Sequence, residues 1–213
     1  MKTLNLIQGT PEWAAHRRTH WNASDAPAML GCSPHKTRTE LIKELATGIT
    51  PEVDAATQRR FDDGHRFEAL ARPLAEEIIG EDLYPVTGVE GPYSASFDGL
   101  TLGEDIAFEH KSLNAELRAA FEQMDLVALN NEDEAGRMLP LHYRVQMEHQ
   151  LLVSGAAKVL FMASKWDGDA LVEERHCWYV PDPMWSAKIV AGWTQLEADV
   201  AAYVPAEVLD RVA

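Results

Sequence analysis

Cysteine is scarce in this chain. Among 213 residues there are two, Cys32 and Cys177, and they stand too far apart to match the spacing of a disulfide framework. A chain of this length buries about two thirds of the surface that it exposes when unfolded, so it needs no covalent cross-links. The sequence therefore excludes a small disulfide-rich secreted protein and favours a reducing, cytoplasmic location.

Long hydrophobic runs are also missing. The longest aliphatic run, Val159 to Ala163, is far shorter than the roughly 20 apolar residues that cross a bilayer. The first residues, MKTLNLIQGTPEW, hold one lysine and no apolar block as long as that of a secretory signal. The phosphate loop of nucleotide-hydrolysing motors and the G-x-S-x-G turn of serine hydrolases do not occur. We expect no membrane span, no export signal and neither of these two chemistries.

Basic residues are outnumbered. The chain has 19 Lys and Arg against 34 Asp and Glu, which gives a net charge of −15. A protein that coats nucleic acid without sequence preference is normally basic. Carboxylates that bind metal nevertheless add to the acidic count, and a basic groove can lie within an acidic exterior. The charge therefore argues against a coat protein and leaves a DNA enzyme open.

The remaining composition, with 46% apolar and 25% charged residues, is that of an ordinary globular protein. Thr10 and Ser24 are placed to cap two helices within the first forty residues, which read as helical. Further helices are expected over 39–46, 57–79, 115–129, 142–155 and from 183 onward, and strands over 84–89, 93–97, 106–113, 158–166 and 171–180. Gly64 and Pro73 are expected to interrupt the long helix. This order predicts a single α/β domain over residues 1–213, with a central mixed sheet flanked by helices.

The most informative stretch is Ser96-Phe97-Asp98-Gly99 followed by Glu109-His110-Lys111. If Asp98 ends one strand and Glu109 lies on the next, a hairpin brings the two carboxylates together. Glu109 and Lys111 are two residues apart on a strand and so share a face. Such a group suits a hard divalent cation such as Mg²⁺, which binds oxygen and activates water beside a phosphate. The E-x-K spacing alone is weak, because a surface pair of opposite charges explains it as well.

Several short motifs accompany this stretch in a fixed order. They are W-x3-R-R from Trp13, A-S-D-A from Ala23, Leu30-Gly31, G-x-x-x-E from Gly64, S-x-D-G from Ser96, E-x-K from Glu109 and Y-x-x-Q-x-x-x-Q from Tyr143. With them, the sequence from Trp13 to about Gly155 resembles the λ-exonuclease-like (YqaJ) family of phage recombination nucleases, within the PD-(D/E)XK nuclease superfamily. The resemblance implies a PD-(D/E)XK core preceded by a helical N-terminal region. One departure is Phe97, which stands where the superfamily often has proline.

The resemblance implies an activity and partners. The family digests linear double-stranded DNA 5′→3′ to mononucleotides, using Mg²⁺ with Mn²⁺ as a substitute and two ions per site, and leaves 3′ single strands for recombination by strand annealing. It implies DNA with a 5′-phosphorylated end as substrate, a ring-shaped homotrimer, and a phage single-strand annealing protein as partner. It also implies a phage or prophage protein that acts in the cytoplasm of a bacterial host.

The resemblance also assigns the catalytic roles. Asp98 and Glu109 resemble the metal ligands of the family, and the main-chain carbonyl of His110 resembles a third oxygen ligand. Glu68 resembles the helix carboxylate that helps to hold a second metal ion. Lys111 resembles the residue that positions the attacking water. A local ion pair between Glu68 and Arg72 is the alternative for Glu68 that the residues themselves allow.

A second set of residues resembles those that contact DNA. Gln146 resembles a helical glutamine beside the active site that helps to position the water, and Tyr143 lies one turn earlier on the same face. Arg17, Ser24 and Ser96 resemble the pocket for the terminal 5′-phosphate. The residues support this pocket independently, because free N–H groups at a helix start, here capped by Ser24, attract phosphate. Arg17 adds a guanidinium that can bind phosphate with two donors.

Two other functions remain open from the sequence. A structure-specific or restriction-type endonuclease on the same core would cut circular DNA, whereas an exonuclease needs an end. A non-catalytic DNA-binding recombination scaffold would have no need of paired carboxylates beside a phosphate. For the exonuclease, candidate basic residues of a DNA channel include Arg17, Lys36, Arg38, Lys43 and Arg66.

Overall fold

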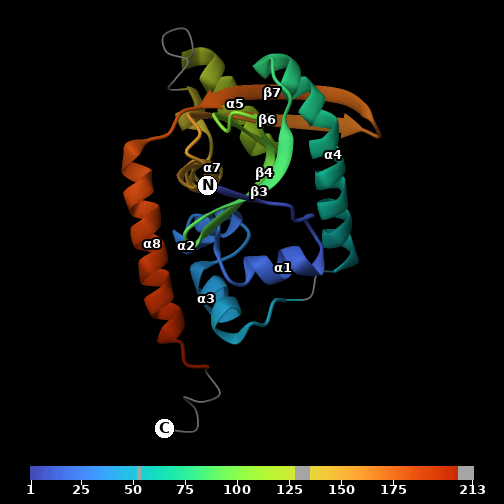
Figure 1. The fold of residues 1–213 in the computed structure, drawn as a ribbon. Helices are drawn as coiled ribbons and strands as arrows, with labels where there is room; N and C mark the ends of the chain where they lie inside the picture. Colours follow the sequence, from blue (N-terminus) through green and yellow to red (C-terminus); the bar gives the residue numbers. More distant parts are fainter. Residues whose placement is uncertain (52–53, 128–134, 206–213) are drawn as a thin grey trace.

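The computed structural model describes residues 1–51, 54–127 and 135–205. Within them a seven-stranded sheet is flanked by helices (Figure 1). The strands are β1 (Lys2–Leu4), β2 (Trp21–Asn22), β3 (Tyr84–Glu90), β4 (Tyr93–Leu100), β5 (Ile106–Ser112), β6 (Lys158–Asp167) and β7 (Ala170–Tyr179). The helices are α1 (Pro11–Arg17), α2 (Ala26–Met29), α3 (Arg38–Thr47), α4 (Ala55–Ile79), α5 (Ala115–Val127), α7 (Leu141–Ser154) and α8 (Pro183–Ala201), with 3₁₀ turns η1 (Ala23–Asp25) and η2 (Gly136–Met138). The predicted mixed α/β architecture is confirmed.

The strands follow the order β1-β3-β4-β5-β6-β7, and β2 pairs with β4 outside this path. The β5–β6 and β2–β4 pairs are parallel and the others are antiparallel, so the sheet is mixed as predicted. β1 and β2 were not predicted. They contain three and two residues, too few to show an alternating pattern, and pairing with β3 and β4 holds them in the sheet.

Three groups of apolar side chains hold the layers together. On one face of the sheet, Ala71 and Ala75 of α4 pack against Phe108, Leu160 and Met162. On the other face, α5 and α7 pack against residues that alternate with these along β5 and β6. A third cluster joins α2, α3, α7 and α8. Figure 1 shows α4 and α8 on opposite sides of the molecule. Among the described residues, no helix combines the length and the apolar character that a membrane crossing requires.

Three local predictions can be compared directly with the structure. Thr10 does cap α1, since its side chain accepts a hydrogen bond from the main chain of Trp13. Gly64 and Pro73 do not interrupt α4, which is continuous because its packing on the sheet outweighs their low helix propensity. Ser24 does not cap a helix, because it lies inside η1 and Asp25 occupies the N-cap position of α2, so the prediction of a Ser24 cap was wrong.

The remaining predicted helices agree closely with the structure where it describes them. The predicted helix over 115–129 corresponds to α5, and its last two residues lie outside the described ranges. The strand predicted over 93–97 extends to Leu100, so Asp98 lies within β4 rather than at its end. That placement shapes the site described next.

Candidate active site

The ladder between β4 and β5 is short. In the described residues two register pairs form it, Gly99↔Phe108 and Leu100↔Ala107. Beyond Gly99 the two strands separate, and Asp98 and Glu109 lie on either side of this fork. The main-chain N–H of His110, which β4 leaves free, donates to Asp98 Oδ2 at 2.7 Å. The hairpin therefore brings the two predicted carboxylates together, as the sequence indicated.

A β-bulge directs Asp98 toward the fork. Between two register pairs with β3, β4 places both Asp98 and Gly99 opposite a single residue, Pro85. Proline has no main-chain N–H. The bulge therefore leaves no unpaired hydrogen-bond donor on β3 at Pro85. A Cβ atom on Gly99 would lie 2.8 Å from the Cβ of Leu83, which is too close for any residue but glycine unless the backbone shifts. The glycine of S-x-D-G thus permits the distortion that aims its aspartate.

Glu109 is held by three side-chain donors. Its Oε1 accepts from Lys111 Nζ and, at 2.6 Å, from Gln146 Nε2. Its Oε2 accepts from Gln150 Nε2, also at 2.6 Å. The carboxylate is 2% exposed, so these bonds are made in a largely water-free setting.

Lys111 remains an ammonium group at neutral pH. Burial alone would lower the pKa of Lys111, but the carboxylates of Glu109 and Asp98 outweigh burial and raise this pKa above its ordinary value. The neighbouring His110 behaves differently, because burial of its ring and the Lys111 charge lower the pKa of His110 to about 3. Its Nε2 instead shares a hydrogen bond of 2.7 Å with Ser164 Oγ.

Glu68 approaches the same fork from α4. Its Oε1 accepts from Arg72 Nη2 at 3.3 Å, and Arg72 Nε donates to the main-chain oxygen of Asp98 at 2.9 Å. The predicted ion pair between Glu68 and Arg72 therefore exists. Because Arg72 also bonds the main chain of Asp98, the pair joins Glu68 to the site. Burial, together with the negative charges of Glu109 and Glu68, raises the pKa of Asp98 well above its ordinary range. Burial likewise raises the pKa of Glu68, which Arg72 partly opposes.

These carboxylates fit a magnesium ion. Mg²⁺ is usually bound by one or two carboxylates together with water, and Asp98 and Glu109 offer such oxygens side by side. The repulsion that raises the pKa values of Asp98 and Glu68 is what a bound cation relieves. No three His, Cys, Asp or Glu side chains form a ready-made ligand cluster in the part of the chain that the structure describes. Glu68 and the His110 carbonyl therefore stay predictions as ligands.

A cavity of about 710 Å³ connects the fork with the N-terminal segment. Nine of the ten predicted site residues line it: Arg17, Ser24, Glu68, Ser96, Asp98, Glu109, His110, Lys111 and Gln146. The tenth, Tyr143, is not among the lining residues. Its ring packs against Phe161, with 5.5 Å between ring centroids, and burial raises the pKa of its hydroxyl.

Part of the cavity lining presents hydrogen-bond donors. Arg17 Nη2 donates to Ser24 Oγ at 3.0 Å, and Trp13 Nε1 donates to Ser96 Oγ at 3.3 Å. Because each serine oxygen already accepts a hydrogen bond, each hydroxyl hydrogen is left to donate to a ligand. Arg17 and the two serines therefore form a site that suits an anion, although Ser24 owes its place to Arg17 and not to a helix start.

Two residues at the site were not predicted. Gln150 is fully buried, and its Nε2 bonds both Glu109 and, at 3.2 Å, the main-chain oxygen of Ser96. Its spacing from Gln146, one helical turn, was visible in the Y-x-x-Q-x-x-x-Q motif and could have placed both on one face. Asp25 binds Arg17 Nη2 at 2.9 Å, and no sequence pattern indicated that contact.

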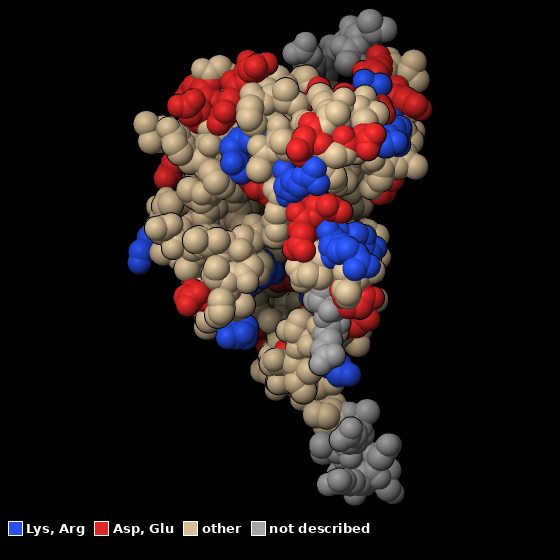
Figure 2. Space-filling model, turned by 90° about the vertical axis from the view of Figure 1, so that its right-hand side faces the viewer, with Lys and Arg blue, Asp and Glu red and all other residues tan. Residues whose placement is uncertain are grey.

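The predicted channel residues are mostly neutralised by ion pairs. Lys36 pairs with Glu44 and Asp25, Arg38 with Asp199, and Arg66 with Asp169. Arg17, which lines the cavity, pairs with Asp25, and Lys43 is exposed on α3. Figure 2 shows Lys and Arg interspersed with Asp and Glu over the described part of the face that carries α4. Basic side chains thus do not gather into one patch on the described part of that face.

Comparisons with known proteins identify the family of the chain and structures of similar fold. The family model of the YqaJ-like viral recombinase domain matches residues 12–157. LHK-Exo, an alkaline exonuclease from Laribacter hongkongensis, has a similar structure, with a TM-score of 0.59 and 24% identity over 95% of this chain and 97% of that chain. Its complex with dAMP gives a TM-score of 0.63 and 22% identity over 91% and 95% of the two chains.

A phage-related exonuclease from Haemophilus somnus 129PT is similar as well, with a TM-score of 0.58 and 10% identity over 91% of this chain and 96% of that chain. No curated protein matches the sequence. These structures match nearly the whole length of this chain and have the same fold. From the matched residues, this chain belongs to the family of YqaJ-like viral recombinase domains.

Proposed function

We propose that this protein is a Mg²⁺-dependent exonuclease that digests linear double-stranded DNA 5′→3′ to mononucleotides during phage-type recombination. Membership of the viral recombinase family and the exonuclease folds of its structural neighbours support a nuclease. The observation that carries the proposal is a single cavity that is lined both by the Asp98–Glu109–Lys111 group and by Arg17, Ser24 and Ser96.

The side chains at the fork suit hydrolysis of a phosphodiester. A bound metal ion would lower the pKa of a water and clamp the scissile phosphate. Lys111, fixed against Glu109, offers a permanent positive charge to an attacking hydroxide or a phosphate oxygen. Gln146 donates to Glu109 through Nε2, so its amide oxygen is directed elsewhere and can accept from a water. Water, phosphate and carboxylates would thus be held in one arrangement.

The anion site supports attack at a 5′ end. Its donors belong to the same cavity as the fork, and a volume of about 710 Å³ lies within the usual range for a small-ligand site. A terminal 5′-phosphate held by Arg17, Ser24 and Ser96 would place the next phosphodiester toward Asp98 and Lys111. An internal segment of DNA has no terminal phosphate to bind there, which favours an exonuclease over an endonuclease.

An assembly would supply the grip on DNA. With a net charge of −15 and a mixed surface around α4, one subunit attracts a duplex poorly. A homotrimer that encircles DNA would retain the substrate by enclosure, and a phage annealing protein would take up the 3′ strand. Light scattering after size-exclusion chromatography tests the trimer, and a monomer at working concentration would contradict it.

The deciding experiment uses a linear duplex with one labelled 5′-phosphorylated end and covalently closed circular DNA, each with Mg²⁺ and with EDTA. We expect metal-dependent release of mononucleotides from the linear duplex alone. Lys111→Ala should lose this activity, whereas Lys165→Ala, which removes an exposed lysine of β6, should retain it. Nicking of the circle would identify an endonuclease, and binding without cleavage of either DNA would identify a scaffold.

A further inference from the structure

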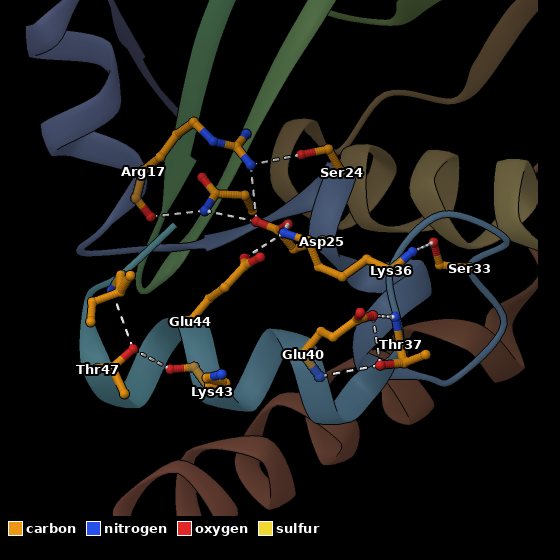
Figure 3. Close-up of polar contacts among 12 residues, drawn as sticks. Arg17, Ser24, Asp25, Ser33, Lys36, Thr37, Glu40, Lys43, Glu44 and Thr47 are labelled. Carbon is orange, nitrogen blue, oxygen red and sulfur yellow. Dashed lines mark hydrogen bonds and ion pairs between the residues drawn. The ribbon is translucent and has the colours of Figure 1, made fainter. Parts of the chain in front are cut away.

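Arg17 is restrained on three sides before any ligand binds. Its Nη2 donates to Ser24 Oγ and Asp25 Oδ2, at 3.0 and 2.9 Å, and its guanidinium carbon lies 4.8 Å from the centre of the Trp13 ring. Figure 3 shows both hydrogen bonds reaching the same nitrogen. Within the described residues, Nε and Nη1 donate to no side chain or carbonyl. They are the donors that remain for a phosphate.

Asp25 can bind Arg17 because it does not cap its own helix. It occupies the N-cap position of α2, where an aspartate usually accepts from an N–H of the first turn. Its side chain makes no such bond, because η1 runs directly into α2 and the backbone of Asp25 is already helical, with φ −94° and ψ −13°. The carboxylate is turned instead toward the cavity wall.

The second oxygen of Asp25 is also engaged. Lys36 Nζ lies 3.7 Å from Asp25 Oδ1 and donates to Glu44 Oε2 at 2.6 Å. Two cations and two carboxylates therefore alternate from Arg17 to Glu44, as Figure 3 shows. Because Lys36 faces Asp25 from the other side, the Asp25 charge is shared and does not fall on Arg17 alone. The Asp25 side chain is 19% exposed, so this arrangement is only partly screened by water.

We propose that Asp25 is a positioning residue that fixes Arg17 for a terminal 5′-phosphate and so makes cleavage depend on that phosphate. The inference rests on the proposed function, in which Arg17 contacts the DNA end. Asp25 does not touch the phosphate itself. It holds Nη2 of the guanidinium, which restricts the orientations that Arg17 can adopt in the cavity that it lines.

The expected size follows from side-chain entropy. An unrestrained arginine loses its rotamer freedom when it binds phosphate, which weakens binding by about ten- to thirty-fold. Ser24 and Trp13 still restrain Arg17 when Asp25 is removed. Loss of Asp25 should therefore lower the preference for a 5′-phosphate over a 5′-hydroxyl by at most about that factor. Asparagine keeps an acceptor oxygen in the same place and should restore most of the preference.

The test measures initial rates on two linear duplexes that differ only in carrying a 5′-phosphate or a 5′-hydroxyl. The full-length wild type, Asp25→Ala, Asp25→Asn, Arg17→Ala and the Arg17→Ala/Asp25→Ala double variant are compared with Mg²⁺. Asp199→Ala is the matched control, because Asp199 accepts from Arg38 Nη2 at 2.5 Å in a similar ion pair whose residues do not line the cavity. Both rates come from one preparation, so a fraction of unfolded protein cancels in their ratio.

The proposal expects a lower ratio for Asp25→Ala, a ratio near that of the wild type for Asp25→Asn and Asp199→Ala, and no further decrease when Asp25→Ala is added to Arg17→Ala. An unchanged or higher ratio in Asp25→Ala would overturn it, the higher value showing that Asp25 competes with phosphate for Arg17. A wild type that digests both ends equally, or neither, would overturn the proposed function as well, so the two failures are distinguishable.

Discussion

Helix α7 carries two groups of buried polar side chains that behave differently. One, the fork group, consists of Gln146 and Gln150 with Glu109 and borders the cavity. The other, the α7–α8 group, consists of Glu148 and His149 with Tyr179 and Trp193 and lies in the interior. In it, Tyr179 donates to Glu148 Oε1 at 2.5 Å and Trp193 Nε1 donates to His149 Nδ1 at 3.1 Å.

The difference lies in what burial does to charge. In the α7–α8 group, burial raises the pKa of Glu148 and lowers the pKa of His149 to about 3, and each side chain has a neutral donor at hand. At the fork, Lys111 stays charged beside Glu109, and Asp98 lies against two further carboxylates. In the interior, α7 thus contributes groups that can be neutral. Beside the cavity its glutamines hold Glu109, one of several carboxylates that repel one another.

The largest effect is expected from removing the Asp98 charge. Asp98→Asn keeps an oxygen that accepts from the His110 N–H but loses a metal-binding carboxylate, so activity should fall about a thousand-fold. Without metal, the same change relieves repulsion by Glu109 and Glu68, so the melting temperature should rise by about 2–4 °C. Nuclease assays and thermal melting in EDTA measure the two effects. A lower melting temperature would contradict the idea that function costs stability here.

The second prediction concerns the link between the fork group and Ser96. Gln150→Met fills a similar volume but cannot hold Glu109 Oε2 or the Ser96 oxygen, so activity should fall about ten- to a hundred-fold. Half-maximal activity should also require more Mg²⁺, since Glu109 loses one of the bonds that orient it. Gln195→Met, on the exposed face of α8, is the control and should change neither value. An unaltered Mg²⁺ titration of Gln150→Met would show that Gln150 only fills space.

The third prediction uses the pH dependence of the α7–α8 group. The pKa of His149 is about 3 in the folded chain against 6.5 when exposed, so its contribution to stability is full above pH 6.5 and is lost as the pH falls. Between pH 7 and pH 5 this loss amounts to about 2 kcal/mol. His149→Gln keeps an acceptor for Trp193. Over the same pH interval, its free energy of unfolding should fall by about 2 kcal/mol less than that of the wild type. Urea unfolding at the two pH values measures this, and His110 contributes equally to both proteins.

The smallest effect is expected from Tyr179→Phe. The change removes one donor from Glu148 and leaves it the main-chain N–H of Asp182, at 2.8 Å. The free energy of unfolding should fall by about 1–2 kcal/mol with no change in nuclease activity. Urea unfolding and the linear-duplex assay check both parts. Lost activity in a folded Tyr179→Phe protein would mean that the two groups on α7 are not separate.

Sequence reasoning succeeded where a pattern repeats or a motif is long. The amphipathic helices, the β6–β7 hairpin and the fork between Asp98 and Glu109 each follow from periodicity or from turn residues. It failed where a contact between distant segments decides the outcome. β1 and β2 exist because β3 and β4 pair with them, and α4 passes through Pro73 because Ala71 and Ala75 are packed on the sheet.

At the site, too, contacts between neighbouring segments decided what the sequence pattern did not predict. Ser24 lines the cavity without capping a helix, because it lies in a 3₁₀ turn and Arg17 binds it. Asp25 has the sequence of a helix cap, and only the folded chain shows that its carboxylate turns to Arg17 instead. The motifs were therefore a better guide to which side chains line the cavity than to the local structure that holds them there.

The fork also determines which half of the site can adjust. β5 is paired with β6 at every position from Ile106↔Lys158 to Ser112↔Ser164, so Glu109 is anchored to the middle of the sheet. Asp98 sits on a bulge of β4 that has already parted from β5. If Asp98 and Glu109 bind a cation as proposed, we expect Glu109 to keep its position and Asp98 to move. Cations of different radius would then be accommodated by a small displacement of Asp98, without a change in the register of the sheet.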